Sequence, residues 1–254
     1  MRFLKKSPAN VDEENPYWMS FSDVMSALLI IFILASVVLI IQLMEIQEEL
    51  RKQQQEFNQE IQELRQAEQV RRTILHEAAD LLQQRGIRVT VSENDTVLSI
   101  PNDILGFGTG AHEIGTDYQG TAVEIGRVLS EVINKDNRVD YLDTIFVEGH
   151  TDNRPLNGFM GKGNWGLWAF RAISLWQLWD ELLPEQFSLD ELENKDNQPL
   201  FSVSGYGPTR PATSRQDTEE ELSQNRRIDI RFTIRRPSSA EYRRVSENLE
   251  EAIR

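Results

Sequence analysis

The sequence predicts one transmembrane α-helix followed by an α+β domain in which helices back a mixed sheet. Three observations lead to this fold class. A single long apolar run extends from Val24 to Leu43, and about twenty such residues are enough for a helix to cross a bilayer. The stretch from Met44 to Arg85 contains neither glycine nor proline, which favours continuous helix. After Gly86, segments with the period of a strand alternate with segments of helical period.

These patterns divide the chain into five expected parts. They are an N-terminal tail (1–17), a transmembrane helix (18–43), a helical linker (44–86), a folded domain (87–236) and a charged C-terminal tail (237–254). Arg2, Lys5 and Lys6 precede the apolar run, whereas glutamates follow it, and the positive-inside bias therefore places the N-terminus in the cytoplasm. The run passes directly into glutamate without a small-residue cleavage site, so we expect a retained anchor and not a signal peptide.

Asp23 stands at the start of the apolar run. A carboxylate at that depth costs about 2.5 to 3.5 kcal/mol on insertion scales, and it therefore indicates an ion or proton site. The alternative is that Asp23 is the first polar residue outside the hydrocarbon and caps the helix, with Ser20 or Ser22 as rivals for that position.

The linker carries a broken heptad pattern of apolar residues, namely Leu43, Ile46, Leu50, Phe57, Leu64 and Ala67. Gln53 and Glu60 interrupt it at positions that should be apolar. A weak parallel coiled coil between two copies is one interpretation, and a single solvated helix with intrahelical Glu–Arg pairs is the other. Gly86 is expected to end the helix.

In the domain we expect strands and helices in alternation. The expected strands are 88–92, 96–100, 144–148, 200–204 and 228–235, and the expected helices are 118–133 and 164–183. A glycine-rich loop, 149–163, joins the third strand to the second helix, whose apolar face includes Leu167, Ala172, Leu175 and Leu178.

Composition and missing motifs exclude several functions. The formal net charge of −14 and the lack of a basic stripe argue against nucleic-acid binding. No cysteine is present, and the three histidines, His76, His112 and His150, lack the spacing of metal ligands. The serines lack a nucleophile-elbow context, and the glycines fit neither a P-loop nor a dinucleotide fingerprint. We therefore expect no enzyme activity, no bound metal and no cofactor.

Charged residues converge where the third strand ends and the second helix begins. Asp152 and Arg171 could together hold a zwitterion, because a carboxylate binds an ammonium group and a guanidinium binds a carboxylate as a fork. The alternative is that Asp152 and Arg171 pair with each other and fix the loop. A further cluster, Asn225-Arg226-Arg227, precedes the last strand.

Two segments resemble a known family. The stretch Trp18–Leu28, with Asp23 in the place of the ion-carrying aspartate, resembles the start of the membrane helix in MotB-type stator proteins. Gly149–Asp152, the glycine-rich loop, Asn164-Trp165, Leu167, Arg171-Ala172 and Asn225–Arg227 are similar to the OmpA-like peptidoglycan-binding domain of those proteins. The resemblance spans most of the chain, and the combination is more specific than either motif alone.

The resemblance implies a function for each segment. Asp23 would carry a translocated proton or sodium ion, with five MotA-like subunits around two copies of this chain. Asp152 and Arg171 would clamp the ammonium and carboxylate groups of diaminopimelate in peptidoglycan, and Thr151, Asn164 and Arg226 would help to shape that site. The chain would be a single-pass protein of the bacterial inner membrane, with its C-terminal domain in the periplasm.

Two departures from the flagellar pattern are visible. Trp168 and Phe170 stand close to Arg171, where aromatic bulk is expected to crowd the site. The segment after the membrane lacks a proline-punctuated plug, and the approach Glu14–Trp18 looks more like the B subunit of the Zorya anti-phage system, ZorB, whose membrane partner is of the ZorA type. We therefore favour a defence motor over a flagellar stator. A passive envelope tether and a peptidoglycan enzyme are weaker alternatives.

Overall fold

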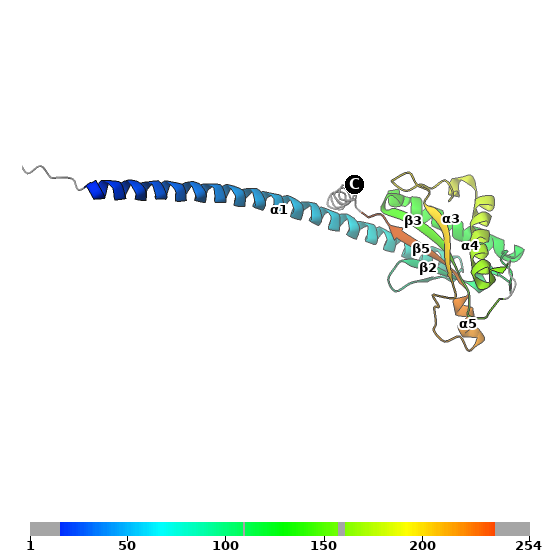
Figure 1. The fold of residues 1–254 in the computed structure, drawn as a ribbon. Coiled ribbons are helices and arrows are strands. Elements are labelled where there is room, and N and C mark those ends of the chain that lie inside the picture. The colour runs from blue at the N-terminus through cyan, green and yellow to red at the C-terminus, as the bar shows by residue number, and fades with distance from the viewer. Residues whose placement is uncertain (1–15, 109, 157–160, 237–254) are drawn as a thin grey trace, which may run out of the picture. The chain divides into compact units, whose positions relative to one another are not determined.

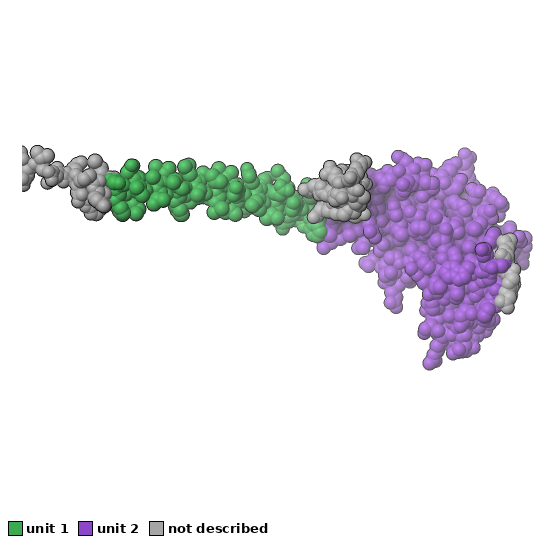
Figure 2. Space-filling view, in the orientation of Figure 1, with its two compact units in different colours: residues 1–59 green, residues 60–254 purple. Residues whose placement is uncertain are grey.

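The computed structural model describes residues 16–108, 110–156 and 161–236 (Figure 1). The chain divides into two compact units, residues 1–59 and 60–254, which are coloured separately in Figure 2. Most of the predicted N-terminal tail, all of the predicted C-terminal tail and Gly158 of the glycine-rich loop lie outside the described residues.

The described residues form a mixed sheet with helices, preceded by one long helix, which confirms the predicted fold class. The helices are α1 (Pro16–Gln84), α2 (Asn102–Leu105), α3 (Thr116–Asn134), α4 (Gly163–Leu182) and α5 (Glu219–Asn225), with 3-10 helices η1 (Lys135–Tyr141) and η3 (Glu185–Phe187). The strands are β1 (Thr90–Val91), β2 (Val97–Pro101), β3 (Leu142–His150), β4 (Phe201–Gly207) and β5 (Arg227–Ile234).

Helix α1 includes the apolar run and continues without a break to Gln84. Its N-terminal part is long and apolar enough to cross a membrane, and none of the residues in its most apolar stretch is buried. The hydroxyl groups of Ser26 and Ser36 donate to the carbonyl oxygens of Ser22 and Phe32, each at 2.7 Å, so these polar groups are satisfied within the helix.

Asp23 lies inside α1, because the helix already begins at Pro16. The capping interpretation of Asp23 is therefore wrong, since an N-cap residue stands outside the helical turns that it caps. The two serines proposed as rival caps, Ser20 and Ser22, are likewise within the helix.

The C-terminal end of α1 belongs to the folded domain. Ile74, Leu75, Ala78 and Leu82 are completely buried and contribute to the main hydrophobic core. The helix ends where predicted: Gly86 has a φ of 77°, a left-handed conformation that glycine adopts without a Cβ clash. The predicted boundary at 86 thus marks the end of the helix, whereas the compact unit already begins at Glu60.

The sheet has the order β1-β2-β5-β3-β4. Strands β3 and β4 are parallel and the other neighbours are antiparallel, so the sheet is mixed. All five expected strands are present, although β1 is only two residues long. The parallel pair places the ends of β3 and β4 at the same edge, and the chain leaves β3 there to enter the glycine-rich loop.

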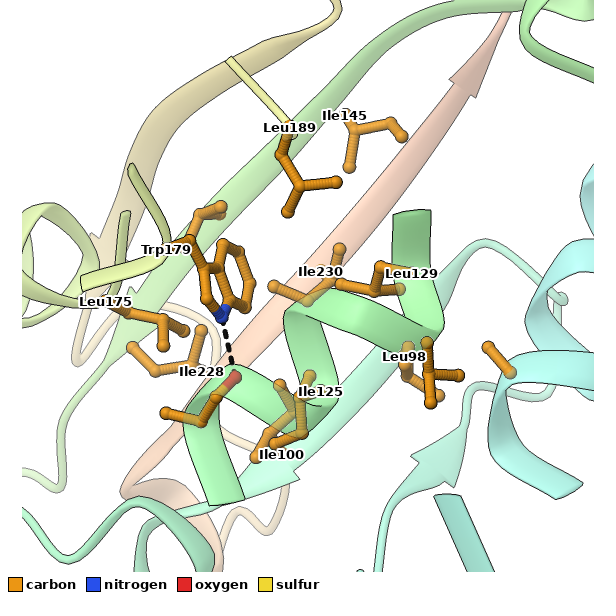
Figure 3. Close-up of a cluster of buried hydrophobic side chains, with 14 of the residues drawn as sticks. Leu98, Ile100, Ile125, Leu129, Ile145, Leu175, Trp179, Leu189, Ile228 and Ile230 are labelled. Atoms are coloured by element: carbon orange, nitrogen blue, oxygen red, sulfur yellow. Dashed lines mark hydrogen bonds between the residues drawn. The ribbon is translucent and has the colours of Figure 1, made fainter. Parts of the chain in front are cut away.

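The core lies between the sheet and helices α3 and α4 (Figure 3). Ile228 and Ile230 of β5 and Leu98 and Ile100 of β2 supply the sheet side of this core. From α4, the indole Nε1 of Trp179 donates a hydrogen bond of 2.7 Å to the carbonyl oxygen of Ala122 in α3. The apolar face predicted for α4 is confirmed, because Leu167, Ala172, Leu175 and Leu178 are all buried.

Trp168 of α4 fills a hollow that glycines leave in the sheet. A Cβ built on Gly205 would lie 1.9 Å from the Trp168 ring, and one built on Gly149 would lie 2.3 Å from the Trp168 carbonyl oxygen. A Cβ built on Gly207 would lie 2.8 Å from the indole nitrogen of Trp168. Glycine at these positions therefore allows α4 to approach the parallel pair of strands.

Candidate functional site

The five predicted wall-binding residues all line one pocket of about 580 Å³. Thr151 and Asp152 directly follow β3, Asn164 and Arg171 lie on α4, and Arg226 joins α5 to β5. The remaining lining comes from the start of α2, the α2–α3 connection, the loop after Asp152, α4 and the start of α5, namely Asn102, Phe107, Gly108, Gly110, Arg154, Pro155, Leu156, Leu167 and Glu219. The strand and helix ends thus bring together residues that are 75 positions apart in the chain.

Asp152 is buried and bound by two arginines. Its Oδ2 accepts hydrogen bonds from Arg154 Nη2 and from Arg226 Nη1, each at 2.8 Å, and Arg154 Nε is a third donor at 3.1 Å. Its Oδ1 accepts the backbone N–H of Arg154 at 3.1 Å. Desolvation by burial raises the pKa of Asp152, but the hydrogen bonds from Arg154 and Arg226 outweigh it and hold the pKa below its usual value. The carboxyl group is therefore ionised at neutral pH.

Arg171 is held by backbone carbonyl groups and not by Asp152. Its Nε donates to the carbonyl oxygen of Ala111 at 2.8 Å and its Nη2 to that of Gly108 at 2.9 Å, with the guanidinium 5.1 Å from the centre of the Phe107 ring. Burial, followed by the positive charge of Arg226, lowers the pKa of Arg171 to about 10, so it remains a cation at neutral pH. No ion pair joins Asp152 and Arg171 among the residues that the structure describes, which is contrary to the loop-fixing interpretation.

Asn164 fixes the loop that follows Asp152. Its Oδ1 accepts the N–H of Leu156 at 3.2 Å, and its Nδ2 donates to the carbonyl oxygens of Arg154 at 2.8 Å and Asp152 at 3.4 Å. Thr151 stands on the other side of Asp152, and its buried hydroxyl oxygen makes no hydrogen bond within the described chain. Asn164 thus shapes the pocket, whereas Thr151 offers a hydroxyl group that no neighbour satisfies.

Sequence reasoning missed two members of the site, Arg154 and Glu219. Glu219 opens α5 and accepts from Arg226 Nη2 at 2.7 Å and from Arg154 Nη1 at 3.2 Å. A local signal for α5 exists in the sequence, since Thr218 and Glu221 form a capping box. Nothing local, however, shows that this helix end lies over Asp152.

Trp168 and Phe170, which were expected to crowd the site, are not part of the pocket lining. The Trp168 side chain packs against Gly205 and Gly207 of the sheet. The ring of Phe170 contacts that of His112 edge-on, with 5.6 Å between the ring centroids. Because neither ring lines the pocket, the space around Arg171 is set by Phe107 and by backbone.

Glu148, His150 and Asp229 form a second buried polar cluster that could hold a metal ion by its ligand types, with ligand atoms within 4.8 Å of one another. Both carboxylates already have a cation. Arg231 Nε lies 2.9 and 3.0 Å from the two oxygens of Glu148, and Arg227 Nε lies 3.0 and 3.1 Å from those of Asp229. A divalent cation would add charge where each carboxylate is already balanced by a guanidinium group, so the residues present favour a structural ion-pair layer over a metal site.

This ion-pair layer predicts a loss of stability in acid. Burial raises the pKa of Asp229, but contact with His150, 3.0 Å away, and the charge of Arg227 lower it below its usual value overall. A carboxyl group with a lowered folded-state pKa contributes stability above its unfolded pKa of about 4, and this stability is lost as the pH falls through the folded value. The free energy of unfolding should therefore fall below pH 4.

The variant Asp229→Asn tests whether Asp229 causes this loss of stability in acid. Its free energy of unfolding should change less between pH 6 and pH 3 than that of the unsubstituted chain, as measured by denaturant titration of the full chain in detergent at each pH. An equal fall in both proteins would show that other carboxyl groups cause the acid sensitivity.

The chain is similar in sequence to two proteins of Bacillus subtilis. No protein-family model matches the chain. The chain is 30% identical to motility protein B of Bacillus subtilis over 141 residues, which are 56% of this chain and 46% of that protein. It is 28% identical to the uncharacterised protein YtxE of the same organism over 138 residues, 54% of this chain and 48% of that protein. The chain thus spans about half the length of the curated relatives it matches.

Three solved structures show a partial likeness in fold to this chain. A MotB-like protein from Desulfovibrio vulgaris aligns with a TM-score of 0.49 and 18% identity, over 68% of this chain and 99% of that one. The cell wall anchor of the T6SS from Pseudomonas aeruginosa aligns at 0.45 and 21%, over 62% and 96%. The periplasmic domain of Helicobacter pylori MotB aligns at 0.44 and 22%, over 65% and 92%.

Proposed function

We propose that this chain, which is similar in sequence to motility protein B, anchors an ion-driven membrane motor to peptidoglycan and serves in anti-phage defence of the Zorya type. The observation that carries the anchoring role is the single pocket in which Thr151, Asp152, Asn164, Arg171 and Arg226 meet. In this proposal the chain acts by binding and by carrying an ion, without enzyme activity.

The pocket suits a ligand that carries both signs of charge. Three guanidinium groups, from Arg154, Arg171 and Arg226, and two carboxylates, from Asp152 and Glu219, line it. A diaminopimelate side chain presents an ammonium and a carboxylate on one carbon, and the rigid fork of a guanidinium can bind the carboxylate with two hydrogen bonds. Asp152 would then take the ammonium group and Arg171 the carboxylate.

Asp23 supports the ion-carrying role. It is an exposed carboxylate within α1, at the start of the apolar run. An acidic side chain at membrane depth requires a partner or a water-filled path, which a surrounding membrane subunit would supply. By the family resemblance, that partner is a MotA-like subunit of the ZorA type, with five copies around two copies of this chain, and the translocated ion is a proton or sodium.

Two alternatives keep part of this scheme. The similarity to motility protein B is also compatible with a flagellar stator, in which the same residues would drive swimming. A passive tether would use the pocket but not Asp23. In each case the chain would cross the inner membrane once, with its N-terminus in the cytoplasm and the folded domain in the periplasm.

Co-sedimentation of the full chain in detergent with purified peptidoglycan sacculi tests the anchoring role. Asp152→Asn should weaken binding about tenfold or more, because a hydrogen bond to a charged group contributes about 1.5 to 3 kcal/mol. Arg171→Lys, which keeps the charge but removes the fork, should also weaken it.

Arg72→Gln is a suitable control, since Arg72 pairs with Asp95 outside the pocket. Its binding should equal that of the unsubstituted chain. Retention of full binding by both pocket variants would exclude this pocket as the wall site.

A further inference from the structure

We infer that Arg154 occupies the place of the ligand's ammonium group in the free domain and has to leave Asp152 before the ligand binds. This inference rests on the proposed peptidoglycan-binding function and adds to it a residue that sets affinity and selectivity. Asp152 is the carboxylate that would bind the ammonium group of the proposed ligand, and in the free domain arginines already bind it.

Two guanidinium groups already balance the charge of Asp152. Oδ2 already accepts from Arg154 Nε, Arg154 Nη2 and Arg226 Nη1, and Oδ1 accepts the backbone N–H of Arg154. A third cationic group could approach only against the charge of two guanidinium groups at 2.8 Å from the same oxygen. An incoming ammonium group therefore gains a full ion pair with Asp152 only if it displaces one of the two arginines.

The two arginines differ in how easily they can leave. The side chain of Arg226 is 20% exposed, whereas that of Arg154 is 52% exposed. Arg226 is also fixed by its place between α5 and β5, while Arg154 lies in the loop after β3. Release of Arg154 therefore breaks fewer buried contacts and requires less rearrangement of the backbone than release of Arg226. Arg154 is the group that exchanges.

Glu219 provides an acceptor for Arg154 after its release. Arg154 Nη1 already lies 3.2 Å from Glu219 Oε2, and Glu219 is 66% exposed at the start of α5. A rotation of the Arg154 side chain can therefore keep this contact while it gives up both bonds to Asp152. The backbone N–H of Arg154 can stay on Oδ1 throughout, so the loop itself need not move.

The exchange makes the site selective. A ligand without a cationic group gains nothing by displacing Arg154 and meets a pocket whose carboxylate is already neutralised. A ligand with an ammonium group exchanges one ion pair for another, and its carboxylate still finds Arg171. Arg154 therefore lowers affinity for every ligand that must reach Asp152, and it discriminates against ligands that lack an ammonium group.

The test compares two probes on the full chain in detergent by calorimetry. The first is a soluble stem peptide containing meso-diaminopimelate with its side-chain ammonium group free, and the second is the same peptide with that group acetylated. Arg154→Gln should bind the free-ammonium peptide about tenfold more tightly than the unsubstituted chain does, because it removes a competing charged hydrogen bond. It should leave affinity for the acetylated peptide unchanged or lower.

Two further variants sharpen the result. Glu219→Gln removes the alternative acceptor and should weaken binding of the free-ammonium peptide, whereas Arg72→Gln, a surface arginine paired with Asp95, should change neither affinity.

If the unsubstituted chain binds the free-ammonium peptide and Arg154→Gln binds it equally or more weakly, the exchange is wrong while the wall-binding function stands. If neither protein binds it, the wall-binding function fails and the exchange fails with it.

Discussion

Replacement of Asp23 by asparagine is expected to abolish phage protection and return plating efficiency to that of cells without the system. The exposed carboxylate at position 23 is the ion-carrying group of the proposed motor, and asparagine keeps its size but cannot exchange a proton. A unit charge that crosses 100 mV releases about 2.3 kcal/mol, so the loss of the carrier removes the whole energy source and not a fraction of it.

The measurement is phage plating efficiency on cells that carry either the intact operon or the variant, with membrane levels of each protein checked by blot. Glu45→Gln is the matched control, because Glu45 is an exposed carboxylate that follows the apolar run and should be dispensable. Asp23→Glu, which retains a carboxylate, should keep part of the protection.

Unchanged protection in the Asp23→Asn strain at equal protein levels would contradict the ion-carrying role and support the passive tether. If the intact operon never protects, swimming becomes the relevant assay, since loss of swimming in the variant would support the flagellar alternative.

The second large effect concerns stability. Trp179→Ala should lower the free energy of unfolding of the folded domain by about 3 to 5 kcal/mol, the usual cost of removing a large buried aromatic side chain. Trp179 is 1% exposed and its indole N–H binds the Ala122 carbonyl oxygen, so it joins α4 to α3 both by packing and by a hydrogen bond. Because domains are stable by only about 5 to 15 kcal/mol, this is a large part of the total.

Denaturant titration of the full chain in detergent, followed by near-UV circular dichroism, measures this change through the loss of fixed aromatic packing in the domain. Trp179→Phe should cost less, about 1 to 3 kcal/mol, since the ring is kept but the Ala122 carbonyl oxygen loses its donor. Leu182→Ala is a control on the same helix, where the side chain is 47% exposed and the change should stay within about 0.5 kcal/mol. An equal cost for Trp179→Ala and Leu182→Ala would contradict the assigned packing.

Much of this molecule could be predicted from its sequence, for identifiable reasons. The apolar run, the stretch without glycine or proline, and Gly86 are local signals, and they predicted α1 and its end. The apolar face of α4 followed from helical spacing, and Leu175 and Ala172 lie in the core as expected.

The wall-binding residues were predicted through the resemblance, and the pocket contains all five of them. Their role in binding stays a prediction, as does the ion-carrying role of Asp23.

The features that escaped prediction depend on long-range contacts. Glu219 contacts Arg154 across 65 positions of the chain, and no local pattern indicates that approach. Trp168 was expected near Arg171 because the two are close in sequence, but its environment is set by Gly205 and Gly207, which only the parallel pairing of β3 and β4 brings beneath it. The capping interpretation of Asp23 failed because the helix begins earlier than the apolar run.

The burial of the last turns of α1 has a mechanical consequence. Ile74, Leu75, Ala78 and Leu82 belong both to the long helix and to the core of the folded domain. Within the second compact unit, detaching these turns of α1 would therefore expose four fully buried side chains. In the proposed motor, a load strong enough to detach these turns would have to open the close-packed core of the domain first.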